Sequence, residues 1–427
     1  MKPLIVVYDA GAAHPGDIAV GLGDWASWVF AAERNEHTRA MEPLLTQFAP
    51  LVWIDDLEQA VVRLAGHGPG GIVTFSEKAL RLTGELAHRL GLPQHSPATT
   101  ALLTDKWNQR NALRAAGVDS VRFHRIDTVA QWADAVAHVG LPAVLKPAFG
   151  GASRNTFLIE DEAGGRRTTE RLLAAGTPGY DPAGALVLEE YLVGRDCAPF
   201  GDYVSIEQFV QQGDITDIAV TGKFPMVPPF RETGRFWPSP LDPQETERVF
   251  DLARRAVRAL GITTGLTHTE AKLTPEGPRF IEVNGRLGGG INELSRRTTG
   301  TDLIGLAGRI ALGERVDIPA LPPGRAVYQI IHPAPRDPCE LVAVEGADEI
   351  RALAEVTVHR PYARPGTRLA GGVQTQELDT VIGETSGLTE LAAVFADIES
   401  RLRYTFAFPQ EPGVRTVTVT GADLGRL

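Results

Sequence analysis

The sequence predicts a multidomain protein that combines α/β and α+β units. Its 427 residues exceed what one compact core usually organises, so two to three domains are expected. The first hundred residues alternate short apolar strands with helical stretches, which is typical of an open α/β domain. Residues 267–290 form a β-hairpin pattern with acids on one face and apolar residues on the other, as in a sheet buried on one face.

Composition narrows the class of partner. The chain is 43% hydrophobic and 22% charged, an ordinary globular balance. Its 42 Lys and Arg against 53 Asp and Glu give a net charge of −11, and no basic tract interrupts this acidity. This negative net charge opposes non-specific binding of nucleic acid.

Cysteine use and hydropathy predict the compartment. Cys197 and Cys339 are the two cysteines, and neither has metal-ligand spacing, so a reducing cytoplasm fits best. The apolar stretch in MKPLIVVYDA is too short for a signal peptide, and nothing approaches about eighteen consecutive apolar residues. We therefore expect a cytoplasmic protein without a membrane span.

The N-terminal elements follow from the hydrophobic pattern. Strands are expected at 4–8, 51–54 and 71–75, and helices at 18–33, 57–64 and 78–90. Gly21-Leu22-Gly23 lies inside a helical stretch, and no third glycine follows at the spacing of a dinucleotide fingerprint, so it indicates helix packing.

The central and C-terminal elements are predicted in the same way. Thr104 or Asp105 caps a helix that ends before Gly117. Further helices are expected at 130–139, 245–260, 301–312 and 388–404, and strands at 121–126, 143–146, 155–159 and 186–192. The Pro- and Gly-rich stretch 217–239 is predicted to be a long active-site loop, and 318–324 a linker.

The hairpin carries a candidate metal site. If Pro275, Glu276 and Gly277 form a three-residue loop, Glu270 lies opposite Glu282, and His268 opposite Asn284. Two facing carboxylates are destabilising, and a divalent cation would relieve their repulsion. An all-oxygen set of two carboxylates and one amide suits Mg²⁺ better than Zn²⁺. The opposite face is expected to be apolar; its residues are Ala271, Leu273, Ile281 and Val283. The alternative is a surface hairpin with ordinary solvated acids.

The residues after the hairpin favour the metal site. Arg286 and Gly288-Gly289-Gly290 follow at once, which combines a guanidinium with close backbone approach. Beside a cation, such a segment binds oxyanions.

Two lysines mark a candidate phosphate site. Lys146 ends a strand and precedes Phe149-Gly150-Gly151-Ala152-Ser153, a loop whose amides could wrap phosphate, although an ordinary glycine hairpin fits equally well. Lys106 opens a helix, where the dipole disfavours a cation, so its position indicates an anionic partner. His268 shares the polar hairpin face and is more simply a hydrogen-bonding partner than a base.

The order of these segments resembles the ATP-grasp superfamily. The segments are DKWNQRNALRAAGV, AVLKPAFGGAS, LEEYLVG, VSIE, HTEAKL and FIEVNGRLGGG. The stretches 221–240 and 267–290 are most similar to its carboxylate–amine ligases, in particular L-amino acid ligases that make dipeptides. The resemblance covers roughly residues 70–400, and ordered motifs are more specific than any single one.

The resemblance implies a fold and an organisation. It implies a pre-ATP-grasp α/β domain at 1–98, an ATP-grasp domain at 99–318 with a lid at about 118–192, and a small α+β domain at 319–427. It also implies ATP and Mg²⁺, with Mn²⁺ as a substitute, and a homodimer.

The resemblance also assigns roles. The expected ATP contacts are Lys106, Lys146, Gly150, Gly151, Ser153, Glu189, Glu190, Tyr191, Leu192, Asp196 and Lys223, where 189–192 form the adenine hinge and Asp196 holds the ribose. The expected metal ligands are Glu270, Glu282 and Asn284. The expected catalytic residues are Arg286, Lys146 and His268. An insertion at 195–203 separates the hinge from VSIE and puts Asp196 in doubt.

The implied reaction is ATP-dependent formation of an amide from a carboxylate, through an acyl phosphate, and an amine. Two alternatives stay open: an ATP-grasp enzyme that uses bicarbonate or another small acid, and a non-catalytic ATP-binding module.

Overall fold

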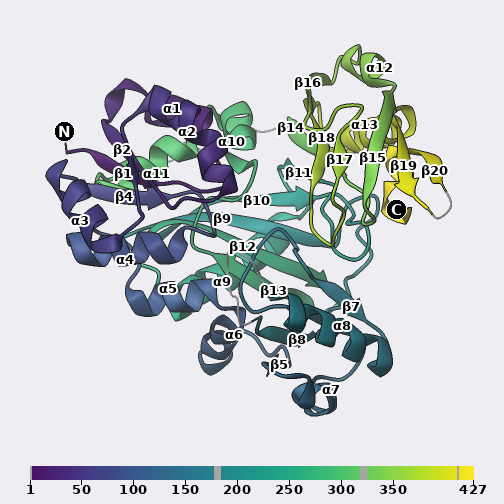
Figure 1. Cartoon of the computed structure of the whole chain (residues 1–427), viewed down its shortest axis with the longest axis horizontal. Coiled ribbons are helices and arrows are strands. Elements are labelled where there is room, and N and C mark those ends of the chain that lie inside the picture. The colour runs from purple at the N-terminus through teal and green to yellow at the C-terminus, as the bar shows by residue number, and fades with distance from the viewer. Residues whose placement is uncertain (1, 177–183, 318–324, 411–412) are drawn as a thin grey trace.

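The computed structural model describes residues 2–176, 184–317, 325–410 and 413–427, so the predicted linker 318–324 lies outside the described residues. Figure 1 shows an N-terminal α/β unit at the upper left, a large central sheet, a small sheet below it and a C-terminal unit at the upper right. Among the described residues, no helix combines the length and apolar character needed to cross a membrane.

The N-terminal unit is a parallel sheet in the order β3-β2-β1-β4 with helices around it. Its strands are β1 Leu4–Val7, β2 Trp28–Ala32, β3 Leu51–Trp53 and β4 Gly71–Thr74. Its helices are α1 Pro15–Leu22, η1 Gly23–Trp25, α2 Glu36–Phe48, α3 Leu57–Gly66 and α4 Leu80–Leu90. The open α/β prediction is confirmed.

One N-terminal element was predicted wrongly. The expected helix at 18–33 ends at Leu22, where Gly23 takes a φ of 46°, and residues 28–32 form β2. Val29 pairs with Ile5 of β1, and nearly all of the strand is buried. A strand buried on both faces has no polar alternation, so its short apolar run could not be told from helix.

The small lower sheet is antiparallel in the order β5-β8-β6-β7. Its strands are β5 Phe123–Ile126, β6 Ala143–Pro147, β7 Phe157–Ile159 and β8 Leu186–Glu190. Its helical elements are η2 Val129–Gln131, α7 Trp132–Val139 and α8 Glu162–Ala175. Helices α5 Pro97–Thr104 and α6 Lys106–Ala115 precede it, and Asp105 caps α6 as predicted.

The central sheet has eight antiparallel strands in the order β13-β12-β9-β10-β11-β14-β18-β16. They are β9 Tyr203–Gln211, β10 Asp214–Lys223, β11 Gly234–Trp237, β12 Thr264–Thr274, β13 Gly277–Asn284, β14 Ala326–Pro333, β16 Val356–Pro361 and β18 Glu377–Thr385. One face packs on α9, Pro243–Ala259, and the helices α10 Ile291–Thr299 and α11 Leu303–Ala311 follow. The opposite face of β9, β12 and β13 carries the polar residues described below.

The predicted loop 217–239 is wrong over much of its length. Strand β10 occupies it up to Lys223 and β11 spans Gly234–Trp237, so only 224–233 and 238–239 lie outside strands. Gly222 pairs with Phe236, and a Cβ at this glycine would lie 2.3 Å from the Phe236 ring. The glycine therefore allows close side-chain packing in a strand, a role that a composition rich in Gly and Pro does not reveal.

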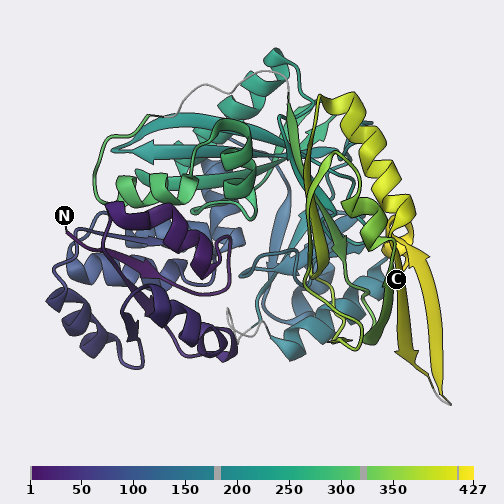
Figure 2. The ribbon, with the colours of Figure 1, turned by 90° about the horizontal axis from the view of Figure 1, so that it is seen from above.

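The C-terminal residues build a second sheet in the order β17-β15-β19-β20 and extend the central one. The remaining elements are β15 Cys339–Glu345, α12 Ala347–Arg351, β17 Arg368–Leu369, α13 Leu388–Arg401, β19 Arg403–Pro409, β20 Val414–Thr420 and η3 Gly421–Arg426. Figure 2 shows the β19–β20 hairpin reaching away from the body. Helix α13 covers these strands, in agreement with the helix predicted at 388–404.

A buried charged cluster lies in this unit. The His332 ring contacts Asp379 at 2.7 Å through Nδ1 and Glu399 at 3.1 Å through Nε2. Tyr404 donates to Asp379, and His359 lies 3.4 Å from the same carboxylate. Burial disfavours the cation, but the two carboxylates outweigh it and raise the pKa of His332 to about 10.

This cluster predicts a pH-dependent stability. Because the folded pKa of His332 lies above its ordinary value of about 6.5, its charge stabilises the fold fully below that value. The contribution is lost as the pH rises through the folded pKa. We expect the difference in unfolding free energy between the wild type and His332→Gln, measured in urea, to shrink between pH 6 and pH 10. A difference independent of pH would show that His332 is neutral in the fold.

Candidate active site

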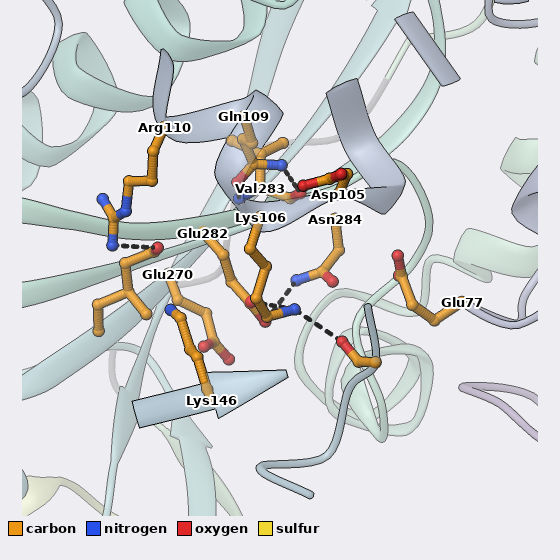
Figure 3. Close-up of polar contacts among 12 residues, drawn as sticks. Glu77, Asp105, Lys106, Gln109, Arg110, Lys146, Glu270, Glu282, Val283 and Asn284 are labelled. Carbon is orange, nitrogen blue, oxygen red and sulfur yellow. Dashed lines mark hydrogen bonds and ion pairs between the residues drawn. The ribbon is translucent and has the colours of Figure 1, made fainter. Parts of the chain in front are cut away.

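The hairpin pairs its polar residues as predicted. Glu270 of β12 lies opposite Glu282 of β13, and His268 lies opposite Asn284. Figure 3 shows Glu270, Glu282 and Asn284 close together at this end of the sheet. The alternation of polar and apolar residues has a period of two, so the burial of one face fixes this register.

The turn that joins the strands differs from the prediction. Thr274 pairs with Gly277, so the loop has two residues and not three. A bulge opposite Glu270 and Ala271 then adds one residue to β13 and restores the predicted register.

The bulge also changes which side chain reaches the core. Phe280 pairs with Ala271 and is fully buried, whereas Ile281 is only partly buried. The predicted core position of Ile281 is therefore wrong, while Leu273 and Val283 pack as expected.

Lys106 connects the hairpin to the glycine loop. It is the first residue of α6, and its Nζ lies 3.0 Å from Glu282 Oε2 and donates to the Gly150 carbonyl at 2.7 Å. Figure 3 shows it between the carboxylate and the loop. Burial opposes its charge, but Glu282 and Glu77 outweigh burial and raise the pKa of Lys106.

Lys146, on strand β6 of the small sheet, lies close to Glu189 and Glu282. Its Nζ lies 2.9 Å from Glu189 Oε2, and both side chains are buried. The pKa of Lys146 is lowered, mainly by burial. The positive charges of Arg110 and Lys106 lower it further, and together these effects outweigh the nearby carboxylates. Burial alone would raise the pKa of Glu282, but Lys106 and Lys146 bring it down to about 2, so the carboxylate is ionised.

Arg110 is a buried residue that the sequence reasoning missed. It lies one turn after Lys106 on α6 and forms a two-pronged contact with Glu189 at 2.9 and 3.1 Å, with Asp119 at 3.1 Å. It also donates to the carbonyls of Phe280 and Ile281 at the hairpin bulge. Its spacing of four residues from Lys106 was the available signal, since such residues share a helix face.

Arg286 lies beside the metal candidates. Its guanidinium donates to Asn284 Oδ1 at 3.3 Å and lies 3.1 Å from Glu77, which follows β4 of the N-terminal unit. Burial is the main reason that the pKa of Glu77 is raised. Glu77 was not predicted, because the contact joins residues more than 200 positions apart.

His268 forms a charged group with two acids. Its Nδ1 lies 2.5 Å from Glu207 and its Nε2 3.3 Å from Glu270. Burial opposes protonation, but both carboxylates outweigh it and raise the pKa of His268 to about 9. The imidazole is then a cation at neutral pH, which favours the hydrogen-bonding role over that of a base.

The predicted adenine hinge follows β8. The amides of Glu190 and Tyr191 donate to the carbonyls of Arg122 and Pro142. The carboxylate of Glu189, by contrast, contacts Arg110 and Lys146. Burial would raise its pKa, but these two cations outweigh burial and lower the pKa to about 2. Its side chain therefore belongs to the charged cluster.

Asp196 stands apart from these residues. It is exposed, and its carboxylate accepts from the Ala198 amide in its own turn at 3.0 Å. Asp202 lies closer to the hinge: it contacts Lys272 at 2.6 Å, and a Cβ on Gly194 would lie 1.7 Å from its Oδ2. The sequence reasoning missed Asp202, although it directly precedes the strand of VSIE.

The glycine loop bends sharply after Lys146. Ala152, Ser153 and Asn155 all have a φ between 53° and 57°, the left-handed region that L-residues rarely adopt. The Asn155 amide donates to the carbonyl of Val373, and the Thr375 amide donates to that of Ala152. The C-terminal segment therefore holds this strained loop.

A second charged group lies farther along the sheet. Lys223 contacts Glu232 at 2.9 Å, and Arg235 contacts the other oxygen of Glu232 at 3.2 Å. Arg235 also donates to the Gly289 carbonyl. A Cβ on Gly290 would lie 2.1 Å from the amide oxygen of Gln329, which explains a glycine there.

The donor set at the hairpin fits a hard cation. Within the described residues, no three His, Cys, Asp or Glu side chains form a metal-binding group. Two facing carboxylates and the Asn284 amide supply oxygen ligands only, as Mg²⁺ prefers. These residues thus suit Mg²⁺ held together with phosphate oxygens.

The amino-acid sequence was compared with those of known proteins. No family model matches the chain. The uncharacterized protein y4rH of Sinorhizobium fredii is 30% identical over 301 residues, which cover 70% of this chain and 60% of that protein. The alanine–anticapsin ligase of Bacillus subtilis strain 168 is 29% identical over 247 residues, 55% of this chain and 52% of the ligase. The chain thus spans between half and two thirds of the length of these relatives.

The structural comparison covers nearly the whole chain. The L-amino acid ligase of Bacillus licheniformis superposes with a TM-score of 0.81 at 20% identity and covers 96% of this chain and 99% of its own. The chain has the ATP-grasp fold. The predicted fold class is confirmed, and the chain resembles carboxylate–amine ligases.

Proposed function

We propose that this ATP-grasp protein is an ADP-forming ligase that joins the carboxylate of an amino acid to an amine. The observation that carries the proposal is the convergence of Lys106, Lys146, Glu270 and Glu282 with Arg286 at one end of the central sheet. This charge pattern suits a nucleotide triphosphate with its metal. The likeness to L-amino acid ligase favours amino acid substrates.

The first step activates the acid. A carboxylate is a poor electrophile, so its oxygen attacks the γ-phosphorus of ATP, the bond to the β-phosphate oxygen breaks, and an acyl phosphate and ADP result. Lys106 and Lys146 neutralise phosphate oxygens, and the Gly150–Ser153 loop covers them. Lys106, which contacts Glu282 at 3.0 Å here, would turn to the phosphates. Mg²⁺, held by Glu270, Glu282 and Asn284, would supply charge neutralisation.

The second step forms the amide. The nitrogen of the amine attacks the acyl carbon, loses a proton, and phosphate leaves. Arg286 steadies the anionic oxygens of the tetrahedral intermediate, and Glu77 and Asn284 fix the guanidinium. His268 acts as a cation that orients Glu270, because its pKa of about 9 keeps it protonated. Water must be excluded meanwhile, or the acyl phosphate hydrolyses.

The nucleotide is proposed to lie along the hinge. The adenine contacts residues 189–192, mainly through the backbone, and Lys223 is a further phosphate contact. For the ribose we propose Asp202 in place of Asp196, because Asp202 lies against Gly194 at the end of the hinge whereas Asp196 is exposed. The free thiols Cys197 and Cys339 are consistent with the cytoplasm as the site of the reaction.

Release of ADP and phosphate tests the proposal. The protein is mixed with MgATP and each pair of amino acids, with single amino acids, bicarbonate and amines alone as controls. We expect ADP and phosphate in equal amounts with particular pairs, and a product whose mass equals the two substrates minus one water. Tight ATP binding without turnover in any mixture would instead support a non-catalytic module, and turnover with bicarbonate alone would support a carboxylating enzyme.

A further inference from the structure

The hydroxyl of Tyr203 is buried, and no residue that the structure describes forms a hydrogen bond with it. It begins β9, its side chain is 2% exposed, and within the described residues its hydroxyl has no hydrogen-bond partner. Burying a hydroxyl without a partner costs free energy, and phenylalanine would fill nearly the same volume without that cost. Such an orphan therefore points to a group that arrives with a ligand.

The register places this hydroxyl between the two charged groups of the sheet. Tyr203 pairs with Lys272 of β12, and the next residue on the same face, Ser205, pairs with Glu270. On the other side, the Lys223 ammonium lies 5.4 Å from the centre of the Tyr203 ring. The phenol thus lies beside the proposed metal ligand Glu270 and beside the Lys223–Glu232 pair.

The surrounding charges make the hydroxyl a donor. Burial, followed by the negative charges of Glu232 and Glu270, raises the pKa of Tyr203 well above its usual range. The phenol stays protonated, so it can donate its hydrogen but does not supply negative charge. Within the described residues the Tyr203 hydroxyl bonds to none of the three nearby acids, which contact other side chains instead: Glu270 contacts His268, Glu232 contacts Lys223 and Asp202 contacts Lys272.

We propose that the Tyr203 hydroxyl donates a hydrogen bond to an oxygen of the bound substrates, either the transferred phosphoryl group or the acyl group it activates. This assignment rests on the proposed ligase function. Both oxygens carry negative charge next to Glu270 and Lys223, so they share the chemistry that a neutral donor recognises. Tyr203 then touches the reacting atoms and is a catalytic residue.

Tyr203→Phe tests the proposal, with Tyr328→Phe as the matched control. Tyr328 is also fully buried, but its hydroxyl donates to the Glu355 carbonyl at 3.0 Å in the C-terminal unit. We expect Tyr203→Phe to keep or raise the melting temperature while kcat/KM falls at least about tenfold. Tyr328→Phe should show the reverse pattern, a lower melting temperature with unchanged kcat/KM.

Two measurements separate the oxygens. A weaker affinity for a non-hydrolysable MgATP analogue with an unchanged KM for the acid would assign the phosphoryl oxygen. A lower kcat or a higher KM for the acid, with unchanged nucleotide affinity, would assign the acyl oxygen. Values for Tyr203→Phe within twofold of the wild type in both measurements would overturn the proposal.

Failure of the ligase function is distinguishable from failure of this inference. If the wild type shows no turnover with any substrate pair, the proposed function fails and the nucleotide titration alone decides the role of Tyr203. Unchanged affinity for the MgATP analogue in Tyr203→Phe would then overturn it, and weakened affinity would support the phosphoryl contact.

Discussion

Glu282→Gln is expected to lower the rate of ADP release about a hundredfold to a thousandfold at saturating substrates. Glutamine keeps the size of the side chain but removes one of the two facing carboxylates, and with it half of the negative charge that would hold Mg²⁺. It also removes the charge that Lys106 contacts at 3.0 Å. The measurement is steady-state ADP formation with the substrate pair found in the screen.

Glu276→Gln is the matched control for this variant. Glu276 lies in the exposed two-residue turn of the same hairpin, so its neutralisation changes the net charge equally without touching the site. Its turnover should equal that of the wild type. A Glu282→Gln protein that keeps more than a tenth of the wild-type rate, with a normal melting curve, would show that the metal site is misplaced.

Arg110→Met is expected to cost about 3–5 kcal/mol of unfolding free energy. The substitution removes the guanidinium shared by the carboxylates of Glu189 and Asp119, so that each keeps one cation only among the described residues, and it removes two hydrogen bonds to the hairpin bulge. Urea unfolding of the full chain, followed by circular dichroism, measures the loss. Turnover should fall as well, because Lys146 shares the Glu189 carboxylate.

Two further variants test whether the loss of stability arises from the buried charges around Arg110. Arg114→Met changes an exposed arginine on the same helix and should cost less than about 1 kcal/mol. Adding Asp119→Asn to Arg110→Met should recover part of the stability, because it removes a carboxylate that has lost Arg110, and its other partner Arg279 is partly exposed to solvent. A single Arg110→Met variant as stable as the wild type would mean that the buried network is not a net source of stability.

The hairpin shows how far local patterns lead. The pairing of Glu270 with Glu282 was predictable because alternation with a period of two allows only one face to be buried. The turn and the bulge were not, since each adds or removes a single residue and their effects on the register cancel. Pattern alone therefore identified the polar face but not the Phe280 core contact.

Contacts between residues far apart in the chain could not be predicted from the sequence. Glu77 reaches Arg286 from another unit of the fold, and Glu207 reaches His268 through the pairing of β9 with β12. Glu207 stands in the VSIE segment and Glu77 in an ordinary one, but neither segment indicates the partner of its acid, which only the assembled fold provides. Strand β2 failed for a different reason, because a strand covered on both sides has no alternation to recognise.

The shared central sheet has a mechanical consequence. Strand β14 hydrogen-bonds to β11 over residues 234–237, so the C-terminal strands and the hairpin with Glu270 and Glu282 belong to one continuous sheet. Under the proposed function, a nucleotide would be admitted by movement of the small β5–β8 sheet, which shares no strand with the central sheet. Backbone hydrogen bonds of Asn155 with Val373 and of Thr375 with Ala152 join the loop after Gly151 to the segment that leads into β18. The central sheet would thereby limit how far the small sheet moves.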